Sequence, residues 1–481
     1  MLINLLARAE GVIRSIRLVC PPDVPLAGRV VPLAPRDAPL GEALLRGALA
    51  IGAVPVSPAV DTAPADTVLV VGTEHGLRQG RPVRLVAGYG WWGGVGGHPL
   101  AVPETYGASP LPFGPYLAAA LAAAEVFLTV RLPGYDAPSA PYGWDCWEQS
   151  MRSEPVPGAP ARLADVDLSG TALAGVGAVG SAWVHALWAS PGLTGKVVLA
   201  DADSKGITLT NLNRCAPFGR CHLGLPKAEG AAQVAADSEI VWDPHRARFE
   251  HLGITPRLLV SAVDTNRARA ELQNRYAPRM LSASTLDLRA EALRVGPPGI
   301  GACLRCYNPP EAVTGDDELR ARTRAGGMAA VRALAAEAGV AEAEVRRWLE
   351  RGDCGEVGTR LLHSLRRQAG PQPARFAVGF TSVMAGTLLA AETVKACMQQ
   401  LMRAAAPQHN NVTFQFLKPT AGINATGPLA RDPQCPACAP THPAMRSWQS
   451  RAAHGSAFGG GARSDRRDTR QPTQAADGFA F

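Results

Sequence analysis

Charged and amide side chains recur between residues 200 and 265, where they could bind a polyphosphate and its metal ion. Asp201 follows an apolar run, and a carboxylate there can accept hydrogen bonds from both hydroxyls of a nucleotide ribose. Asn211, Arg214 and Lys227 then supply an amide, a guanidinium and an ammonium group, which suit phosphate oxygens. Asp264 follows a later apolar run, and one carboxylate facing such groups suits Mg²⁺. Each residue alone is typical of a solvated surface, but their order along the chain predicts one polyphosphate site.

Three glycines upstream of these residues predict the turn that binds the phosphates. Gly175, Gly177 and Gly180 lie between an apolar run that begins at Thr171 and a helix-like segment at 182–188. In such a strand–turn–helix unit, the first glycine permits the turn and the second lets a phosphate approach the backbone. The third glycine lets the helix pack closely on the strand, and the amides at the helix start face the anion.

Two Cys-x-x-Cys pairs predict a zinc site. Cys303 with Cys306, and Cys435 with Cys438, can supply four thiolates in a closed tetrahedral site, which is therefore structural. Ten cysteines in a chain without a secretory leader favour metal binding or catalysis over disulfides. A redox role for the pairs, or a chance spacing, is the alternative.

Cys354 is the candidate nucleophile. It lies in a glycine-flanked loop, where a thiol is accessible as a nucleophile must be. Arg351 favours the thiolate, whereas Asp353 and Glu356 oppose it, so the neighbouring charges do not decide its ionisation. A plain buried or surface role is expected for the rival cysteines, which are Cys146, Cys215, Cys221 and Cys397.

The charged residues need a sheet whose strands end beside them. From about 165 to 300, apolar runs alternate with helical segments, which predicts a doubly wound, mainly parallel, Rossmann-like α/β sheet. Ligands of such open sheets bind at the carboxyl ends of the strands, where the glycine turn and the charged residues fall. The predicted strands lie at 171–176, 196–200, 257–262 and 290–295, with a late strand at 411–416.

Residues 1–135 predict a smaller α/β unit with buried strands at 67–72 and 84–87. Its segment 113–126 resembles segment 380–394: in each, a phenylalanine precedes a glutamate by twelve residues, with Ala-Ala-Glu in register. Two unrelated alanine-rich helices would also look alike. The repeat instead predicts that the first unit is a degenerate copy of the second, which makes the chain a pseudo-dimer.

Composition and spacing also divide the chain. A Pro/Gly/Ser-rich linker is expected at 136–160, followed by the second unit at 161–440. A charged helical insertion at about 307–372 contains Cys354, and a Gly/Ser/Ala-rich tail at 441–481 is expected to be disordered. At 88–93 the spacing Gly-x-Gly-x-x-Gly recurs, but the glycines and proline that follow cannot begin a helix, so we predict a plain turn.

Composition excludes several classes of protein. The 47% hydrophobic and 19% charged residues are typical of a folded soluble chain. Part of the formal charge of +7 lies in the tail, so nucleic-acid binding is not expected. The apolar stretches 113–130 and 376–398 contain charged residues and predict buried helices, not membrane spans. The amino terminus lacks the basic leader and apolar core of a signal peptide, so we expect a cytoplasmic protein.

Together, these motifs resemble those of the ubiquitin-activating enzymes and their ThiF/MoeB relatives. That family has a glycine turn, Asp-x-Asp, Asn-Leu-x-Arg, a Pro-Lys, a later Asp, two Cys-x-x-Cys pairs, and a cysteine ahead of a small-residue helix. The resemblance covers roughly 165–440 and holds in order and spacing. The matching residues are Gly175, Gly177, Gly180, Asp201, Asp203, Asn211, Arg214, Lys227, Asp264, Cys303, Cys306, Cys354, Glu392, Lys395, Cys435 and Cys438.

The resemblance implies ATP-dependent activation of a ubiquitin-like protein. Asp201 would lie at the ribose, the amide and the two cations at the ATP phosphates, Asp264 at Mg²⁺, and the four cysteines at Zn²⁺. The carboxylate of the substrate's terminal glycine would attack the α-phosphorus and pyrophosphate would leave. Cys354 would then take the acyl group as a thioester and pass it to a ubiquitin-conjugating-like enzyme. A fused inactive-plus-active chain is similar to the activators of bacterial antiphage conjugation operons, and a further homodimer stays open.

Three departures from the family pattern, and three other functions, remain. The family's middle glycine is Ala178, the glutamine after Asn-Leu-x-Arg is Cys215, and the family arginine from a partner subunit's amino-terminal helix has no match. An adenylyltransferase for a sulfur-carrier protein would share the chemistry as far as the adenylate. An NAD-dependent oxidoreductase would not need Arg214 and Lys227 beside the turn. A scaffold that binds nucleotide without turnover is the third.

Overall fold

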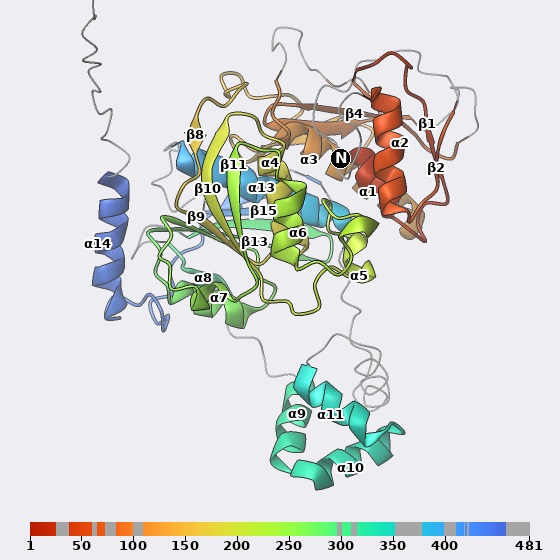
Figure 1. The fold of residues 1–481 in the computed structure, drawn as a ribbon. Helices are drawn as coiled ribbons and strands as arrows, with labels where there is room; N and C mark the ends of the chain where they lie inside the picture. Colours follow the sequence, from red (N-terminus) through yellow and green to blue (C-terminus); the bar gives the residue numbers. More distant parts are fainter. Residues whose placement is uncertain are drawn as a thin grey trace, which may run out of the picture.

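The computed structural model shows how the predicted strands assemble. Among the described residues, nine strands of the second unit form one mixed sheet (Figure 1). These strands are β8 (Val166–Asp167), β9 (Thr171–Ala174), β10 (Leu193–Ala200), β11 (Ile240–His245), β12 (Leu258–Ser261), β13 (Arg279–Leu286), β14 (Arg289–Val295), β15 (Asn411–Gln415) and β16 (Ala425–Gly427). The structure describes residues 1–25, 38–59, 65–72, 83–98, 100, 109–295, 301–308, 315–351, 378–398, 410–417, 419–420 and 423–457.

The parallel part of this sheet is wound in two directions from its central strand β9. β10 and β11 follow on one side of β9, and the chain then returns to place β12 and β13 on the other side. β14, β15 and β16 extend the sheet in antiparallel fashion, and β8 pairs with β10. The predicted α/β fold is therefore confirmed, although β11 and β13 were not among the predicted strands.

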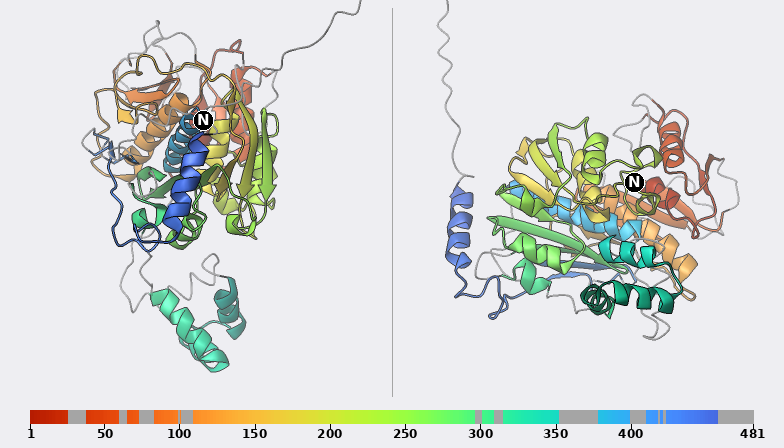
Figure 2. Two further views of the ribbon diagram at one scale, coloured as in Figure 1. Left: turned by 90° about the vertical axis from the view of Figure 1, so that its left-hand side faces the viewer. Right: turned by 60° about the horizontal axis from the view of Figure 1, so that its bottom comes forward.

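Helices cover both faces of the sheet (Figures 1 and 2). Leu173 and Val260 face a core shared with α4 (Ala178–Trp188) and α13 (Gly379–Cys397). Ala172 and Leu259, their neighbours in sequence, face the opposite core. That side is covered by α7 (Asn266–Gln273), α8 (Leu304–Tyr307) and α14 (Ala444–Ala457). Strands buried on both faces read as continuous apolar runs, which is why the sequence predicted them.

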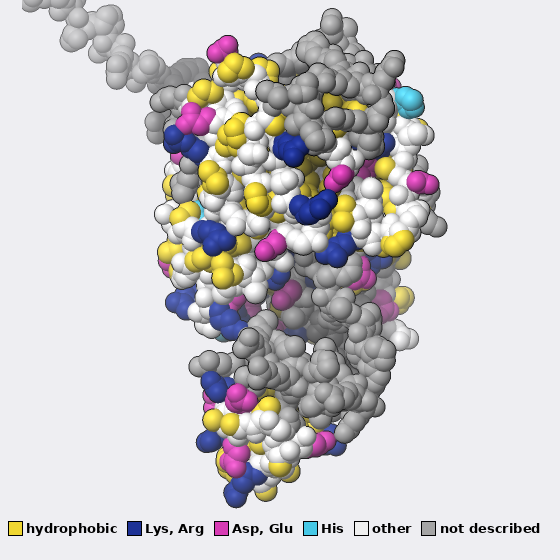
Figure 3. All heavy atoms as spheres, turned by 90° about the vertical axis from the view of Figure 1, so that its right-hand side faces the viewer, with side chains coloured by type: hydrophobic (Ala, Val, Ile, Leu, Met, Phe, Trp, Pro, Cys, Tyr) yellow, Lys and Arg dark blue, Asp and Glu magenta, His cyan; other side chains and the backbone are white. Residues whose placement is uncertain are grey.

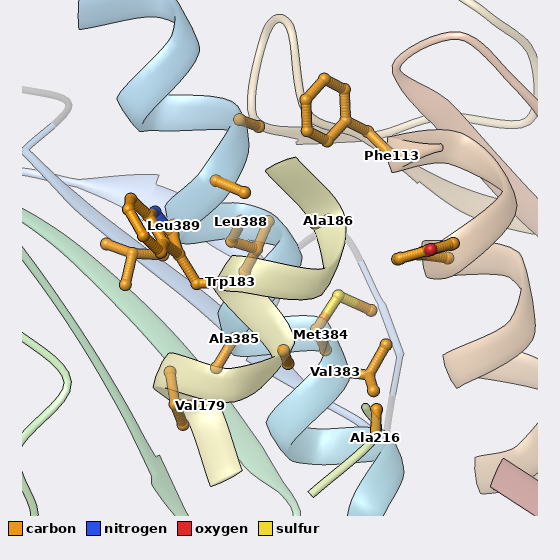
Figure 4. Close-up of a cluster of buried hydrophobic side chains, with 14 of the residues drawn as sticks. Phe113, Val179, Trp183, Ala186, Ala216, Val383, Met384, Ala385, Leu388 and Leu389 are labelled. Carbon is orange, nitrogen blue, oxygen red and sulfur yellow. The ribbon is translucent and has the colours of Figure 1, made fainter. Parts of the chain in front are cut away.

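The crossing of α4 and α13 needs a glycine. A Cβ atom on Gly386 would lie 2.6 Å from the Cβ of Ala182 and 2.8 Å from the carbonyl oxygen of Val179. Figure 4 shows Val179 and Trp183 of α4 beside Ala385 and Leu389 of α13 at this crossing. Any larger residue at position 386 would push apart the two helices that pack on the sheet.

The first unit has a sheet of its own. Its described elements are α1 (Leu2–Ala7), β1 (Ile16–Leu18), α2 (Leu40–Ile51), β2 (Val56–Pro58), β3 (Val68–Val71), β4 (Val83–Tyr89), β5 (Trp92–Gly96), α3 (Phe113–Arg131), β6 (Tyr142–Asp145) and β7 (Ser150–Met151). β3 to β7 pair in chain order, and β1 pairs with β2. Residues 142–151 thus form sheet strands where a linker was expected. The spacing at 88–93 is the β4–β5 hairpin turn, with Gly90 at a φ of 56°, so a turn was the correct prediction there.

The sheet of the first unit repeats the pairing pattern of the second. β3 and β4 are parallel and β5, β6 and β7 follow antiparallel, just as β12 and β13 are parallel and β14, β15 and β16 follow antiparallel. α3 lies between β5 and β6 in the chain, and α13 lies between β14 and β15. The two helices pack side by side, and the rings of Phe127 and Phe380 meet at 5.5 Å.

One described helix, α3, is long and apolar enough to cross a membrane. Its most apolar window has a mean hydropathy of 1.6, and 72% of that window is buried inside the protein. It packs against β4, β5 and α13. Burial among these elements accounts for its apolar sequence, as expected for a core helix.

Two segments at the edges of the second unit are helical. α9 (Gly315–Ala325), α10 (Gly327–Ala338) and α11 (Glu342–Arg351) form a small group below the sheets in Figure 1, within the range 307–372 where a helical insertion was predicted. The guanidinium of Arg320 lies 4.6 Å from the ring centre of Trp348 within this group.

α14 corrects the expectation of a disordered tail from 441, because Trp448 is buried and donates to the carbonyl of Ala277 at 2.9 Å. The face drawn in Figure 3 carries interspersed basic and acidic side chains.

A buried charge network connects the two units. Glu392 of α13 accepts hydrogen bonds from Arg294 and from Gln149, the latter at 2.6 Å, and pairs with Lys395 one helical turn later. Lys395 also donates to the carbonyl oxygens of Cys146 at 2.7 Å and Trp147 at 3.1 Å. Glu392 and Lys395 are each 1% exposed. The motif residues Glu392 and Lys395 therefore join α13 to the strand end of the first unit.

We expect Glu392 to make folding stability depend on acid pH. Burial alone would raise the pKa of Glu392, but Arg294 and Lys395 lower it to about 2. Because the folded pKa lies below the unfolded value of about 4.3, Glu392 contributes stability above that pH and loses it as pH falls toward 2. Glu392→Gln should flatten this dependence and cost about 3–5 kcal/mol at pH 7, because it leaves the buried Lys395 and the partly buried Arg294 without their partner.

Urea unfolding at pH 7, 4.5 and 3 measures both effects. Glu148→Gln is the matched control, because its carboxylate is half exposed and pairs with Arg152 at only 3.5 Å. Equal free energies of unfolding for the two variants at pH 7 would contradict a stabilising role of the buried network.

Candidate functional site

The glycine turn lies at the carboxyl end of β9, where the direction of winding reverses. Open α/β sheets bind ligands at this switch point. Gly175 has a φ of +91°, which L side chains rarely adopt, and a Cβ on Gly180 would lie 2.0 Å from the carbonyl oxygen of Gly175. A Cβ on Gly177 would meet no atom within 4 Å. The first glycine thus permits the turn, the third permits close packing, and the second faces space that a ligand could enter.

Asp201 and Asp203 connect the glycine turn to Lys227. The backbone N–H of Val176, inside the turn, donates to Asp201 Oδ2 at 2.7 Å, and the N–H of Asp203 donates to Asp201 Oδ1 at 2.9 Å. Lys227, the first residue of α6 (Lys227–Val234), donates from Nζ to Asp203 Oδ2. The three predicted residues and the turn are therefore linked by consecutive hydrogen bonds.

The carboxylates keep Lys227 charged. Burial alone would lower the pKa of Lys227, but the hydrogen bond to Asp203 and the charges of Asp201 and Asp203 raise it above its ordinary value. Burial alone would raise the pKa of Asp203, and the ammonium of Lys227 lowers it. An ammonium and carboxylates therefore lie together beside the turn at neutral pH.

Asn211 and Arg214 lie on the segment 208–222, here called the clamp segment, which begins with the short helix α5 (Leu209–Leu212). Asn211 is buried, and its side-chain oxygen accepts from the N–H of Thr208 at 2.8 Å, which caps α5. Arg214 is half-buried and donates to the carbonyl of Thr210 at 3.1 Å. The amide oxygen of Asn211 thus organises the clamp segment, a role that the motif alone did not predict.

Cys215 joins the clamp segment to the helix that follows the glycine turn. Its thiol is buried and interacts with the hydroxyl of Ser181, in the first turn of α4. Burial raises the pKa of Cys215, and the positive charges of Arg214, Arg8 and Lys227 oppose that rise. The charges of these three side chains are therefore all felt at the thiol of Cys215, beside the start of α4.

The loop that leads from β12 to Asp264 packs against the glycine turn. A Cβ on Gly175 would lie 2.8 Å from the carbonyl oxygen of Ala262 and 3.0 Å from the N–H nitrogen of Val263. Asp264 comes next and is exposed, and Thr265 caps α7 by accepting from the N–H of Ala268 at 3.2 Å. A carboxylate at this place could bind a metal ion held by phosphates at the turn.

The four predicted zinc ligands come together. The Sγ atoms of Cys303, Cys306, Cys435 and Cys438 all lie within 4.8 Å of one another. Cys303 lies 3.6 Å from both Cys306 and Cys435, and Cys306 lies 3.3 Å from Cys438, measured between Sγ atoms. A tetrahedral site with Zn–S bonds of about 2.3 Å places its sulfurs about 3.8 Å apart. The cluster therefore fits one structural zinc ion.

The candidate nucleophile and its rivals differ in what the structure describes. Cys354 lies outside the described residues. Burial raises the pKa of Cys146, Cys215 and Cys397, so these thiols are held protonated. Cys221 is exposed.

One buried cation at this site was missed by sequence reasoning. Arg8 follows α1 in the first unit and is 3% exposed, and its guanidinium donates to carbonyl groups of the clamp segment. The signal was present as an arginine at the end of the apolar run Leu2–Ala7. Charged residues are rarely buried without a partner, so this position could have been questioned.

Known proteins resemble part of this chain. Uncharacterized protein y4jF of Sinorhizobium fredii is 27% identical over 233 residues, which are 45% of this chain and 42% of y4jF, so the chain spans about two fifths of that relative. E. coli MccB with MccA-N7isoASN has 16% identity and a TM-score of 0.37 over 56% of this chain and 66% of MccB. E. coli MccB with ATP has 15% identity and a TM-score of 0.36 over 57% of this chain and 68% of MccB. The model of the ThiF family matches residues 159–437, more than half of the chain, and the chain therefore belongs to the ThiF family.

Proposed function

We propose that this protein uses Mg²⁺–ATP to adenylate the carboxyl terminus of a protein or peptide. The observation that carries the proposal is the hydrogen-bonded series from the glycine turn through Asp201 and Asp203 to Lys227. It combines a phosphate-binding turn, a ribose-binding carboxylate and a cation in one place, on the sheet of a ThiF family member. A hydride-transferring enzyme on such a sheet would not need the cation of Lys227 beside the turn, nor a second cation, Arg214, on the clamp segment.

Each group has a task in this reaction. A substrate carboxylate oxygen attacks the α-phosphorus of ATP, an acyl–phosphate bond forms, and the bond to pyrophosphate breaks. Lys227 and Arg214 stabilise the negative charge that builds on the leaving pyrophosphate. Asp201 orients the ribose through the second lone pair of each carboxylate oxygen. Asp264 would hold Mg²⁺, which neutralises phosphate charge.

We further propose that the substrate is a ubiquitin-like protein ending in glycine, within an antiviral conjugation system. Cys354 then attacks the acyl adenylate, AMP leaves, and the thioester passes to a ubiquitin-conjugating-like enzyme. The motif order and the fused first unit support this reading. An adenylyltransferase for a sulfur carrier would stop at the adenylate. Formation of a thioester on Cys354 would therefore distinguish an activator of a ubiquitin-like protein from such an enzyme.

The arrangement of the units supports a pseudo-dimer within one chain. Helices α3 and α13 each carry a glutamate that forms an ion pair. Glu125 pairs with Arg84 in the first unit, and Glu392 pairs with Arg294 in the second. Both hairpins have two-residue turns, so positions can be counted from them. By this count Arg84 corresponds to Leu281, and Gly97 corresponds to Arg294. A Cβ atom on Gly97 would lie 3.2 Å from Arg84 Nη1, so the two positions of the first unit are neighbours.

The arginine has thus moved to the neighbouring strand while its pairing with the helix glutamate is kept. Trp144 and Phe414 also occupy equivalent register positions. Trp144 lies one residue before the partner of the first residue of β5, and Phe414 lies one residue before the partner of the first residue of β14. Their rings meet at 5.5 Å with an interplanar angle of 88°. Contact between equivalent residues is expected near a two-fold axis, so this pair supports a duplicated origin of the two units.

ATP–pyrophosphate exchange tests the adenylation step. The purified protein, mixed with Mg²⁺–ATP, labelled pyrophosphate and candidate ubiquitin-like proteins, should form labelled ATP only when a substrate with a free carboxyl-terminal glycine is present. A substrate shortened by that glycine is the control. Labelled ATP that forms equally with the shortened substrate would contradict attack by the terminal carboxylate.

Cys354→Ala should abolish a thiol-sensitive adduct with the substrate and leave pyrophosphate exchange unchanged. The reason is that thioester formation follows the adenylate and needs a thiolate, whereas adenylation does not. Non-reducing gels and intact mass measure the adduct, and Cys221→Ala is the matched control at an exposed cysteine. Retention of the adduct in Cys354→Ala would assign the thioester to another cysteine.

A further inference from the structure

The clamp segment is fastened to the amino-terminal helix of the other unit. Arg8, at the end of α1, donates from Nη2 to the carbonyl oxygens of Ala216 at 2.7 Å and Phe218 at 2.8 Å, and from Nη1 to that of Leu212. More than 200 residues separate Arg8 from these partners in the chain. One guanidinium therefore holds three carbonyl groups on both sides of Arg214.

Further contacts fasten the same segment at other points. Asn4 donates from Nδ2 to the carbonyl of Ala216 at 3.1 Å and accepts from Arg8 Nε at 2.8 Å, so it also orients the guanidinium. Arg220 reaches in the opposite direction, from the clamp segment to the end of α2. Its Nη2 donates to the carbonyl of Gly52 at 3.1 Å and its Nε to that of Ile51 at 3.3 Å.

The clamp segment needs such support because it has little regular structure of its own. α5 has only four residues, and the buried carbonyl groups that follow it require donors. Burial lowers the pKa of Arg8 to about 10, and Cys215 opposes that fall, so Arg8 stays charged at neutral pH. Hydrogen bonds from a charged donor are about twice as strong as neutral ones, so loss of Arg8 removes the main attachment.

We propose that Arg8 is a positioning residue that holds Arg214 in place for the phosphates, so that the first unit controls the ATP affinity of the second. This inference rests on the proposed function, because it assigns Arg214 to the phosphates beyond the α-phosphate. Arg8 acts through the backbone of the clamp segment. AMP binding, which uses the glycine turn and Asp201, should therefore depend on Arg8 far less than ATP binding does.

Nucleotide binding to the full chain tests the proposal, with Mg²⁺–ATP and AMP as the probes. Arg8→Met should raise the Kd of ATP about tenfold or more, since small misplacements of a charged group have large effects, and change the Kd of AMP by less than about twofold. Arg8→Lys should fall between, because one ammonium reaches fewer of the carbonyls. Arg46→Met, at an exposed arginine of α2 paired with Glu42, should match the wild type for both ligands.

Hydrogen exchange gives a second readout that needs no ligand. The N–H groups of Arg214 and Cys215 donate to the carbonyl of Asn211 at 3.1 and 2.9 Å, and they should exchange faster in Arg8→Met, while those of β9 do not. If Arg8→Met does not fold, Arg220→Met loosens the same segment from an exposed position and should act in the same direction.

The outcomes are distinct. A wild-type protein that binds neither nucleotide contradicts the proposed function, and the exchange readout then still decides the role of Arg8. A folded Arg8→Met protein with an unchanged ratio of ATP to AMP affinity and unchanged exchange at Arg214 and Cys215 overturns the inference.

Discussion

Lys227→Met is expected to slow ATP–pyrophosphate exchange by at least about a hundredfold. Removal of one preorganised donor to a developing negative charge costs about that factor in other enzymes. Lys227 is held beside the glycine turn by Asp203, and its raised pKa keeps it charged above neutral pH. The loss should therefore appear in the rate at saturating substrate and persist from pH 6 to pH 9.

Lys196→Met is the matched control for this prediction. Lys196 is 62% exposed on β10 and pairs with Asp243 at 2.9 Å, away from the glycine turn. A surface ion pair of this kind contributes at most about 1 kcal/mol, so exchange and stability should stay close to those of the wild type. Equal exchange rates in Lys227→Met and Lys196→Met would show that the ammonium of Lys227 does not contribute to catalysis.

Asp203→Asn separates charge from position at Lys227. The variant keeps the cation but weakens the hydrogen bond that holds Nζ. We expect a loss of exchange smaller than that in Lys227→Met, with the larger part in the KM for ATP. A greater loss than in Lys227→Met would show instead that Asp203 itself contacts the nucleotide or its metal.

If the four-cysteine cluster holds zinc, as its geometry fits, removal of that ion is expected to destabilise the second unit strongly. Structural zinc contributes folding free energy directly, and loss of such a site belongs to the largest class of single-site effects, above about 4 kcal/mol. For a domain of this size that corresponds to a fall in Tm on the order of 10 °C. Cys303→Ala and Cys438→Ala should behave alike, because each leaves an incomplete set of thiolates.

The packing around the cluster shows where the damage should appear. Cys303, Cys435 and Cys438 belong to the same buried cluster as Leu272 of α7 and Trp448 of α14. Tyr276 also donates to the carbonyl of Ala437 at 2.7 Å, between the second pair of cysteines. Hydrogen exchange should therefore rise in α7 and α14 before it rises in α4.

Metal analysis and calorimetry check this prediction. The wild type should contain one zinc per chain, and both variants should contain much less. Cys221→Ser, at an exposed cysteine, is the control and should keep the metal and the Tm. A Tm that does not change after complete removal of zinc would rule out a structural site.

Periodicity and spacing were sufficient for the features that depend on local sequence. The strand–glycine turn–helix unit at 171–188 was predicted because positive φ and close packing restrict those positions to glycine. The strands buried on both faces were predicted because they are continuous apolar runs. The cysteine pairs were predicted because a metal site demands a fixed ligand set.

Elements whose stability comes from distant partners were missed. β13 contains polar residues but pairs on both sides, with β12 and β14. β6 and β7 lie in a segment rich in proline and glycine, and they form strands because β6 pairs with the edge of β5 and β7 then pairs with β6. α14 is polar over most of its length, and Met445 and Trp448 hold it against the protein.

By itself, the sequence determined the glycine turn, the four thiol ligands, the order of the charged residues and the α/β class, because each follows from local geometry or ligand chemistry. Only the tertiary structure decided that Asp203 holds Lys227, that Asn211 caps α5, and that Arg8 of the first unit fastens the clamp segment of the second. The physical reason is that a polar or charged side chain takes whichever donors or acceptors the fold brings within hydrogen-bonding distance. Spacing along the chain does not show which partner that will be.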